Sequence, residues 1–234
     1  EIETKVSQFA GATDPYVVYV LQLADQYALT TKGSIGNNFE QVASIFEGLK
    51  TGDNKHQYHH HPQEFSLKKE YFPVVAPADR TAVSRLWTKF TEALLKLDWS
   101  AENQVSLAKA SLTLLFRYAT TIPNPSNVNA EVAWYDFAKM KAGLAVCIHE
   151  YLQSRVEQND LEIIDEEEPI LIIRADLSGI QNFIYDIASK QASKNLKGRS
   201  FYIQLLSETV LQKMLDEFGL FEGNVMYASG GNFF

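Results

Sequence analysis

The sequence predicts an α+β protein with a mostly helical region over residues 1–155, an acidic linker over 156–169 and a mixed region over 170–234. Apolar residues recur at helical spacing through most of the first region. Four consecutive acids at 165–168 precede a proline, and such charge runs are usually solvated connectors. The last region then reads as strand, turn, helix, strand and Gly-Gly turn, which is a mixed architecture.

The composition is that of an ordinary globular protein. The 234 residues are 46% hydrophobic and 21% charged, and the net charge of −8 gives no support to a globally basic nucleic-acid binder. The single cysteine, Cys147, excludes an intramolecular disulfide and fits a reducing cytoplasm, so we expect a cytoplasmic protein. No apolar run approaches the roughly 20 residues that a membrane-spanning helix needs. Because the chain starts without methionine and stops just after a Gly-Gly turn, we expect it to be part of a longer polypeptide.

Helix caps and apolar stripes place the helices of the first region. Asp14 before Pro15 predicts a helix start, and Asp79 predicts the cap of a helix that runs to about Leu97. Ser100 is a candidate cap for the next helix, which Pro123 ends. A further helix is expected from about residue 130 to 153.

Polar residues in this region invite a metal interpretation, but simpler ones are favoured. Four histidines lie in the segment 51–62, yet adjacent histidines do not converge easily on one ion, so a mobile surface loop is the preferred interpretation. His149 is more simply a hydrogen-bonded core histidine, and Cys147 a buried small residue. For Asp25, a solvated position on the helix face is the simpler interpretation.

The segment that follows the acidic linker holds the first candidate site. Residues 170–175 are predicted to form a central strand buried on both faces, with Asp176 at its carboxyl end, where nucleotides bind in open sheets. Ser178-Gly179 permits a tight turn into a helix, whose first backbone N–H groups suit a phosphate. An ordinary strand–turn–helix remains the alternative.

Two later segments add candidate groups. Arg199, preceded by Lys197-Gly198, is expected to lie before a long helix, where an anion would be favoured. Alternatively, Ser200 caps that helix and Arg199 pairs with a surface acid. Residues 225–228 are predicted to form a second strand, which Ser229-Gly230-Gly231-Asn232 turn back as a hairpin.

This order of elements is that of the ferredoxin-like palm of polymerases and nucleotide cyclases. Active palms hold two metal ions with an acid after the first strand and acids at the hairpin tip. Asp176 could be the first of these acids, but the tip carries the neutral amide of Asn232. An unrelated diguanylate-cyclase-like enzyme, which needs acids at the tip, is therefore disfavoured.

Three motifs carry a family resemblance. DLSGIQNFI at 176–184, GRSFYIQLLSE at 198–208 and YASGGNF at 227–233 closely resemble the first palm of the large subunit of type III CRISPR–Cas effector complexes, the Csm-type Cas ten family. The helical region resembles that family's HD-derived N-terminal part more loosely. The resemblance implies an antiviral-defence protein that combines an HD nuclease acting on single-stranded DNA with two palms. Binding of target RNA to the complex switches on the synthesis of cyclic oligoadenylates from ATP.

The resemblance implies a nucleotide site without its own catalysis. It places ATP against Ser178, Gly179, Gln181, Arg199 and the tip residues 229–232, of which Ser229, Gly230, Gly231 and Asn232 form the turn. No His-Asp dipeptide and no Gly-Gly-Asp-Asp motif occurs in the chain, so we expect this segment to be inactive alone, with Mg or Mn bound only in the complete protein. Asp25 and Asp176 are candidate metal ligands. The implied partners are the other effector subunits, guide RNA and target RNA, and no membrane. The alternative is a scaffold that docks the subunit binding the guide-RNA handle, with no nucleotide role.

Overall fold

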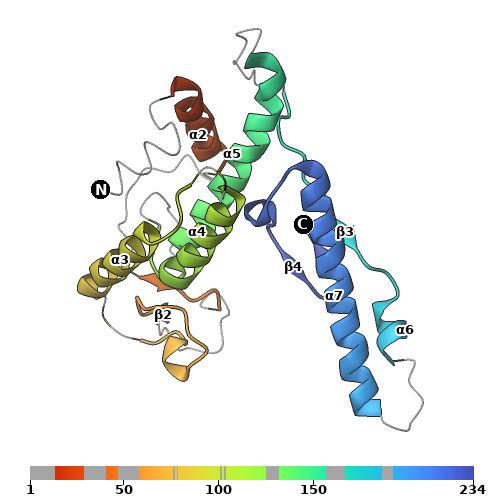
Figure 1. Cartoon of the computed structure of the whole chain (residues 1–234). Coiled ribbons are helices and arrows are strands. Elements are labelled where there is room, and N and C mark those ends of the chain that lie inside the picture. Colours follow the sequence, from red (N-terminus) through yellow and green to blue (C-terminus); the bar gives the residue numbers. More distant parts are fainter. Residues whose placement is uncertain are drawn as a thin grey trace. The chain divides into compact units, whose positions relative to one another are not determined.

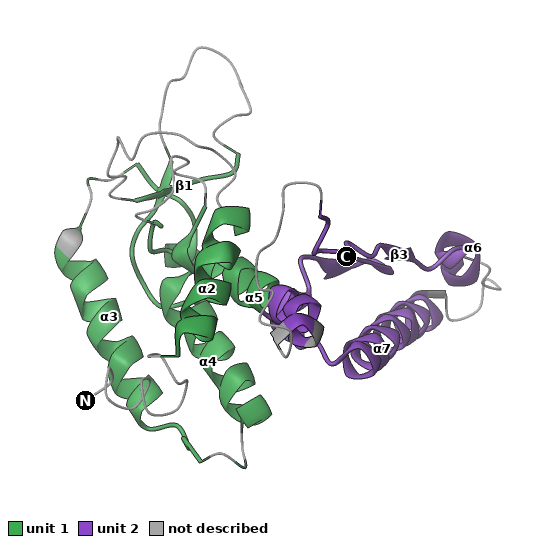
Figure 2. Cartoon of the chain, turned by 90° about the horizontal axis from the view of Figure 1, so that it is seen from above, with its two compact units in different colours: residues 1–145 green, residues 146–234 purple. Residues whose placement is uncertain are grey.

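A computed structural model describes residues 14–28, 41–46, 58–75, 77, 79–100, 102, 104–124, 132–156, 167–185 and 192–234. The chain divides into two compact units, Glu1–Ala145 and Val146–Phe234 (Figure 2). Most of the expected linker at 156–169 lies outside the described residues, so the domain boundaries stay a prediction. The structure is mixed and helix-rich with few strands, and no helix in its described part has the length and apolar character needed to cross a membrane.

The first unit is built on helices. They are α2 (Pro15–Ala28), α3 (Arg80–Leu95), α4 (Gln104–Ala119) and α5 (Trp134–Val156), the last of which continues into the second unit. Helices α3 and α4 lie side by side (Figure 1). Their apolar faces meet in a core whose buried members are Leu86, Phe90, Tyr118 and Ile122. The predicted apolar stripes thus face this core, and burial of such side chains is the main stabilising contribution.

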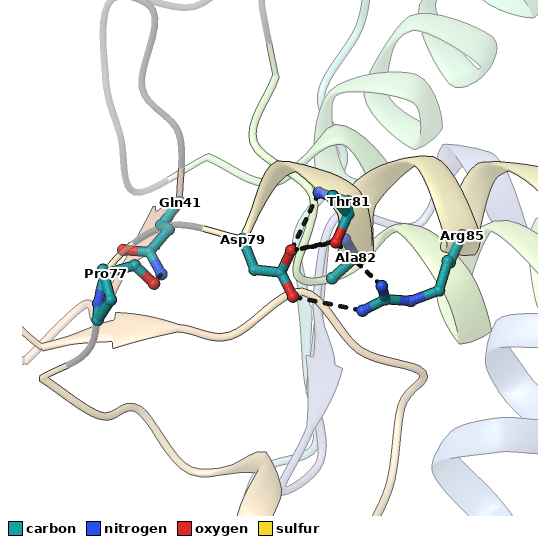
Figure 3. Close-up of polar contacts among 6 residues, drawn as sticks. All are labelled: Gln41, Pro77, Asp79, Thr81, Ala82 and Arg85. Carbon is teal, nitrogen blue, oxygen red and sulfur yellow. Dashed lines mark hydrogen bonds and ion pairs between the residues drawn. The ribbon is translucent and has the colours of Figure 1, made fainter.

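Capping residues set the starts of α2 and α3 as the sequence predicts. The Asp79 carboxylate accepts hydrogen bonds from the backbone N–H groups of Thr81 and Ala82, both at 3.0 Å (Figure 3). Its other oxygen lies 3.3 Å from the Arg85 guanidinium. Asp14 likewise accepts from the backbone N–H of Tyr16 at 2.9 Å. These bonds satisfy N–H groups that a helix start leaves without an intrahelical partner.

Ser100 is not the cap of α4, because that helix begins later, at Gln104. The backbone N–H of Ser100 instead bonds the Asp98 carboxylate at 3.0 Å, which makes a local turn before the helix. Short polar side chains stabilise turns as readily as caps, so the sequence signal was ambiguous at this point.

Part of the histidine segment is ordered, which corrects its prediction as a mobile loop. Strand β2 (His59–His60) pairs antiparallel with β1 (Val42–Ala43), and His59 also exchanges backbone hydrogen bonds with Val74. His60 is half-buried, and its burial lowers the pKa of the imidazole. The rest of the segment, 51–57, lies outside the described residues.

The second unit carries a small sheet and a long helix. Its elements are β3 (Ala175–Asp176), α6 (Ile180–Tyr185), α7 (Ala192–Phe218), the 3₁₀ turn η3 (Glu222–Asn224), β4 (Ala228–Ser229) and β5 (Asn232–Phe233). The three strands are antiparallel in the order β3-β5-β4, so the hairpin strand β5 lies between the first strand and the one reached through the helices. Helix α6 lies beside α7 (Figures 1 and 2).

The prediction of a buried central strand over 170–175 is wrong. Only Ala175 of that run is in a strand, and Leu171 and Ile172 are 81% and 66% exposed. A strand buried on both faces needs neighbouring strands and covering layers. Among the described residues, β3 pairs with β5 alone, through Ala175 and Asp176.

The expected start of the long helix is also wrong. Helix α7 begins at Ala192, so Gly198, Arg199 and Ser200 lie inside it and Ser200 is not its cap. Glycine costs a helix only about 1 kcal/mol relative to alanine, and the many other helix-forming side chains outweigh that cost. The N–H groups near Arg199 are therefore committed to the helix rather than available to an anion.

Candidate nucleotide site

The Gly-Gly hairpin is the centre of the site. Ser229 and Asn232 face each other across the turn, and Gly230 and Gly231 have φ angles of 60° and 84°. Two successive positive φ angles are typical of a type I′ turn, which matches the twist of the flanking strands. The turn therefore requires the glycines that the sequence supplies.

The hairpin is held against the first strand and the turn that follows it. Asp176 is the register partner of Asn232, and the backbone N–H of Leu177 donates to the Gly231 carbonyl at 2.9 Å. A Cβ atom at Gly231 would lie 2.1 Å from Cδ1 of Ile180, the first residue of α6. The fold thus brings together Asp176, the Ser178-Gly179 turn and the Gly-Gly tip.

A cavity of about 400 Å³ lies between the tip and helices α6 and α7. The tip residues Ser229, Gly230, Gly231 and Asn232 all line it, whereas Asp176, Ser178, Gly179, Gln181 and Arg199 do not. Its volume falls within the range of small-molecule sites, roughly 300–1,000 Å³. Four of the predicted nucleotide-binding residues are therefore placed at one cavity.

Helix α7 adds polar side chains that sequence reasoning missed. Gln204, Ser207 and Glu208 line the cavity together with Ser200, for which the sequence suggests only a capping role. These positions are four, seven and eight residues after Ser200, so they share one helix face. This spacing is the sequence signal for a polar helix face. The signal is not apparent when the helix is expected to start only after Arg199.

The polar groups of the cavity are mostly neutral. Glu208 is its one acidic lining residue, and its carboxylate accepts a hydrogen bond from Gln204 Nε2 at 2.9 Å. Asn232 contributes an amide that both donates and accepts hydrogen bonds. Such a set suits hydrogen bonding to a polar ligand better than binding two divalent cations, which prefer several carboxylate oxygens.

Sequence comparison shows the family. Residues 169–234 match the family model described as Csm1 subunit domain B. The chain is 34% identical over 130 residues to a Streptococcus thermophilus protein named "CRISPR system single-strand-specific deoxyribonuclease Cas10/Csm1 (subtype III-A)". It is 27% identical over 190 residues to an identically named protein of Enterococcus italicus. The chain belongs to the Cas10/Csm1 family.

The matches cover much of this chain but a small part of its relatives. They span 52% and 72% of the chain, and 17% and 24% of the Cas10/Csm1 proteins of S. thermophilus and E. italicus. Two solved structures share the fold with TM-scores of 0.63, namely Csm1 of T. onnurineus and a Csm1–Csm4 cassette in complex with AMPPNP. Each is 23% identical, and each match covers 92% of this chain and 27% of the other.

The metal expected in a complete Cas10/Csm1 protein does not fit the residues around Asp25. The Oδ2 atom of Asp25 accepts a hydrogen bond from the Lys141 ammonium at 2.7 Å. The carboxylate is therefore already paired with a cation. Asp176 is exposed, and no carboxylate besides Glu208 lines the neighbouring cavity. In the described part of the chain, no three His, Cys, Asp or Glu side chains gather where they could hold a metal ion.

Cys147, interpreted from the sequence as a buried small residue, is half-buried. Asn224 Nδ2 lies 3.4 Å from its sulfur, and burial raises the pKa of the thiol. A raised pKa keeps the thiol protonated near neutral pH, and the thiol is a far weaker nucleophile than the thiolate.

Proposed function

We propose that the chain is part of the large subunit of a type III CRISPR effector complex and that residues 170–234 supply the non-catalytic half of an ATP site. The observation that carries the proposal is the Gly-Gly tip with neutral Asn232, which lines a cavity together with a polar face of α7. Solved relatives of the same fold were crystallised as Csm1–Csm4 cassettes with one ATP and with cA4, and this supports a nucleotide as the ligand.

The strand arrangement supports a palm domain over 170–234. A first strand, a helical crossing and a hairpin whose second strand inserts next to the first strand make the split β-α-β half of a ferredoxin-like fold. In this half, the tip glycines allow close approach of a ligand to the backbone. Ser229, Asn232 and Ser200 offer hydrogen-bond donors and acceptors to the nucleotide.

Catalysis would be completed outside this segment. Metal-assisted attack by a ribose hydroxyl needs carboxylates that hold Mg²⁺ or Mn²⁺ at the triphosphate, and the tip offers an amide in their place. We infer that the partner palm of the complete protein supplies them, and that residues 1–155 derive from the HD part. Guide RNA, target RNA and the other effector subunits are the proposed partners, in the cytoplasm.

The test is ATP binding by the complete large subunit with Ser229→Trp. An indole at the hairpin tip should fill the cavity mouth and lower ATP affinity at least tenfold in isothermal titration. Ser106→Trp, at an exposed position of α4, is the matched control and should leave the affinity unchanged. Equal ATP affinity in the Ser229 variant and the unsubstituted subunit would refute the site.

A scaffold role is the second candidate, favoured by the exposed apolar run before β3. Leu171 and Ile172 are 81% and 66% exposed to solvent. Exposed apolar side chains of that size are commonly covered by a partner in an assembly. Pull-down of the neighbouring subunit by the Leu171→Gln, Ile172→Gln variant, alongside ATP titration, separates the two roles. Loss of the partner with intact ATP binding would assign this surface to assembly. Partner binding by a subunit that takes up no ATP would favour a purely structural palm.

A further inference from the structure

Arg199 makes contacts that differ from those expected of a phosphate ligand. Its Nη1 atom donates to the backbone carbonyl of Phe183 at 2.5 Å, and its guanidinium lies 5.3 Å from the centre of the Phe183 ring. Phe183 also contacts Tyr202 of α7, with ring centres 5.9 Å apart. Arg199 therefore joins α7 to the C-terminal half of α6, where helix carbonyls lack intrahelical partners.

Helix α6 in turn supports the hairpin tip. Ile180 at its start packs directly on Gly231, because a Cβ atom added at Gly231 would lie 2.1 Å from Ile180 Cδ1 and the side chain would have to shift. Ile180 and Ile184 both line the cavity opposite α7. The distance between α6 and α7 therefore determines the width of the cavity. It also determines how closely α6 packs against the hairpin tip.

We infer that Arg199 is a positioning residue that clamps α6 onto α7 and thereby shapes the cavity for the nucleoside part of the ligand. This inference builds on the proposed ATP site and assigns Arg199 a role other than phosphate binding. The guanidinium suits the clamp because its planar fork can donate to a carbonyl while it stacks on an aromatic ring, which a lysine ammonium does not reproduce.

Two ligands separate the clamp from a phosphate contact. If Arg199 bound phosphate, its removal would lower the affinity for ATP and leave the affinity for adenosine unchanged, since adenosine carries no phosphate. If Arg199 shapes the cavity, its removal weakens both ligands by the same factor. The Arg199→Lys variant also distinguishes the two roles, because lysine keeps the positive charge that binds phosphate and lacks the planar guanidinium fork that the clamp needs.

The experiment titrates ATP and adenosine into the complete large subunit with Arg199→Met or Arg199→Lys. We expect both variants to lose between about threefold and tenfold in affinity for each ligand, with an unchanged ATP-to-adenosine ratio. Arg85→Met on α3 is the matched control. Hydrogen exchange at residues 180–185 should accelerate in both Arg199 variants, which reports the clamp independently of ligand.

The outcomes distinguish this inference from the proposed function. A loss confined to ATP, or rescue by lysine, would show that Arg199 binds phosphate and would overturn the clamp while the ATP site stands. Absence of ATP binding in the unsubstituted subunit would overturn the proposed function, and this role of Arg199 with it. Should Arg199→Met disturb folding, Phe183→Leu keeps the carbonyl and removes the stacked ring. This variant should lower the affinity for ATP and for adenosine by the same factor, and by less than Arg199→Met does. A loss of affinity for ATP alone would contradict the clamp.

Discussion

Gly231 combines a backbone and a packing requirement at one residue. Its φ of 84° is unfavourable for other residues, and a methyl group there would meet Ile180 Cδ1 at 2.1 Å. Gly231→Ala should therefore lower the free energy of unfolding by roughly 2–4 kcal/mol, combining strain and overpacking. Thermal or denaturant unfolding of the chain measures this loss.

Gly230→Ala is the matched control for that substitution. Gly230 has a φ of 60° but nothing within 4 Å of a Cβ atom, so the backbone cost of about 1–2 kcal/mol acts alone. In an Ile180→Ala background, Gly231→Ala should cost less than in the unsubstituted chain, since the clashing Cδ1 atom is absent there. Equal destabilisation by both glycine variants would show that packing against Ile180 contributes nothing.

The Asp25–Lys141 pair can be tested by charge exchange. The two side chains are 42% and 29% exposed, so the pair should stabilise the first unit by at most about 1 kcal/mol. Asp25→Lys alone should destabilise through like-charge repulsion, and adding Lys141→Asp should restore the melting temperature. Metal content of the complete protein should be unchanged by the exchange. A loss of bound metal in the exchanged variant would mean that Asp25 is a ligand.

At the scale of elements, the cap of α3 predicts a pH dependence. Hydrogen bonds from Thr81 and from the Ala82 backbone, with Arg85 nearby, lower the pKa of Asp79 from 3.8 to about 2. A lowered pKa in the folded state means that the charged cap stabilises fully above about pH 4 and that this contribution is lost as the pH falls toward 2. Asp79→Ala should lower stability at pH 7, and the difference from the unsubstituted chain should vanish near pH 2.

Asp79→Asn separates the charge from the cap. Asparagine caps a helix about as well as aspartate, so this variant should retain most of the stability at pH 7. It should also lose the acid-dependent decline attributed to this residue. Denaturant titrations of the three proteins between pH 2 and pH 7 provide the comparison. An undiminished decline in the Asn variant would assign the pH dependence to other carboxylates.

Two of the helix starts were predictable here, and the sheet was largely not. A helix is specified locally by caps and by spacing, and Asp14 and Asp79 signalled two starts correctly. A strand depends on partners distant in sequence, so the apolar run at 170–173 gave no sign that it would lack neighbours. The Gly-Gly hairpin was predictable because its turn chemistry is local.

The site was half predictable for the same reason. The tip residues 229–232 follow from the turn sequence, and the structure places them at the cavity. The polar face of α7 is not evident from the sequence, because Gly198 suggests a helix that starts after it, whereas Gly198 lies within the helix. The charge of Arg199 suggests an anion-binding residue, and only the fold reveals its contact with Phe183.

At the scale of the molecule, the proposed role follows from what the second unit has and lacks. It has a hairpin turn with two glycines at positive φ, and this turn lines a cavity together with polar side chains of α7. It offers an amide at the tip, where metal-dependent transfer would need carboxylates. A segment that spans 17% to 24% of two relatives can thus hold a nucleotide in the proposed scheme and leave the chemistry to another part of the complete protein.

The two compact units should respond separately to local substitutions. Thr121, fully buried in the first unit, accepts from the Gln63 N–H at 3.0 Å and donates to the Gln63 carbonyl at 2.9 Å. Thr121→Val leaves both groups without this partner and should cost about 1–3 kcal/mol, while Thr121→Ser keeps the hydroxyl and serves as control.

Hydrogen exchange of the chain can locate the effect of each substitution. We expect Thr121→Val to accelerate exchange in α3 and α4 and to leave α7 unchanged, and Gly231→Ala to do the reverse, because units with their own cores open locally. Helix α5 belongs to both units and should therefore report partial acceleration in each variant. Acceleration of α3, α4 and α7 together in either variant would show that the chain unfolds as one cooperative unit.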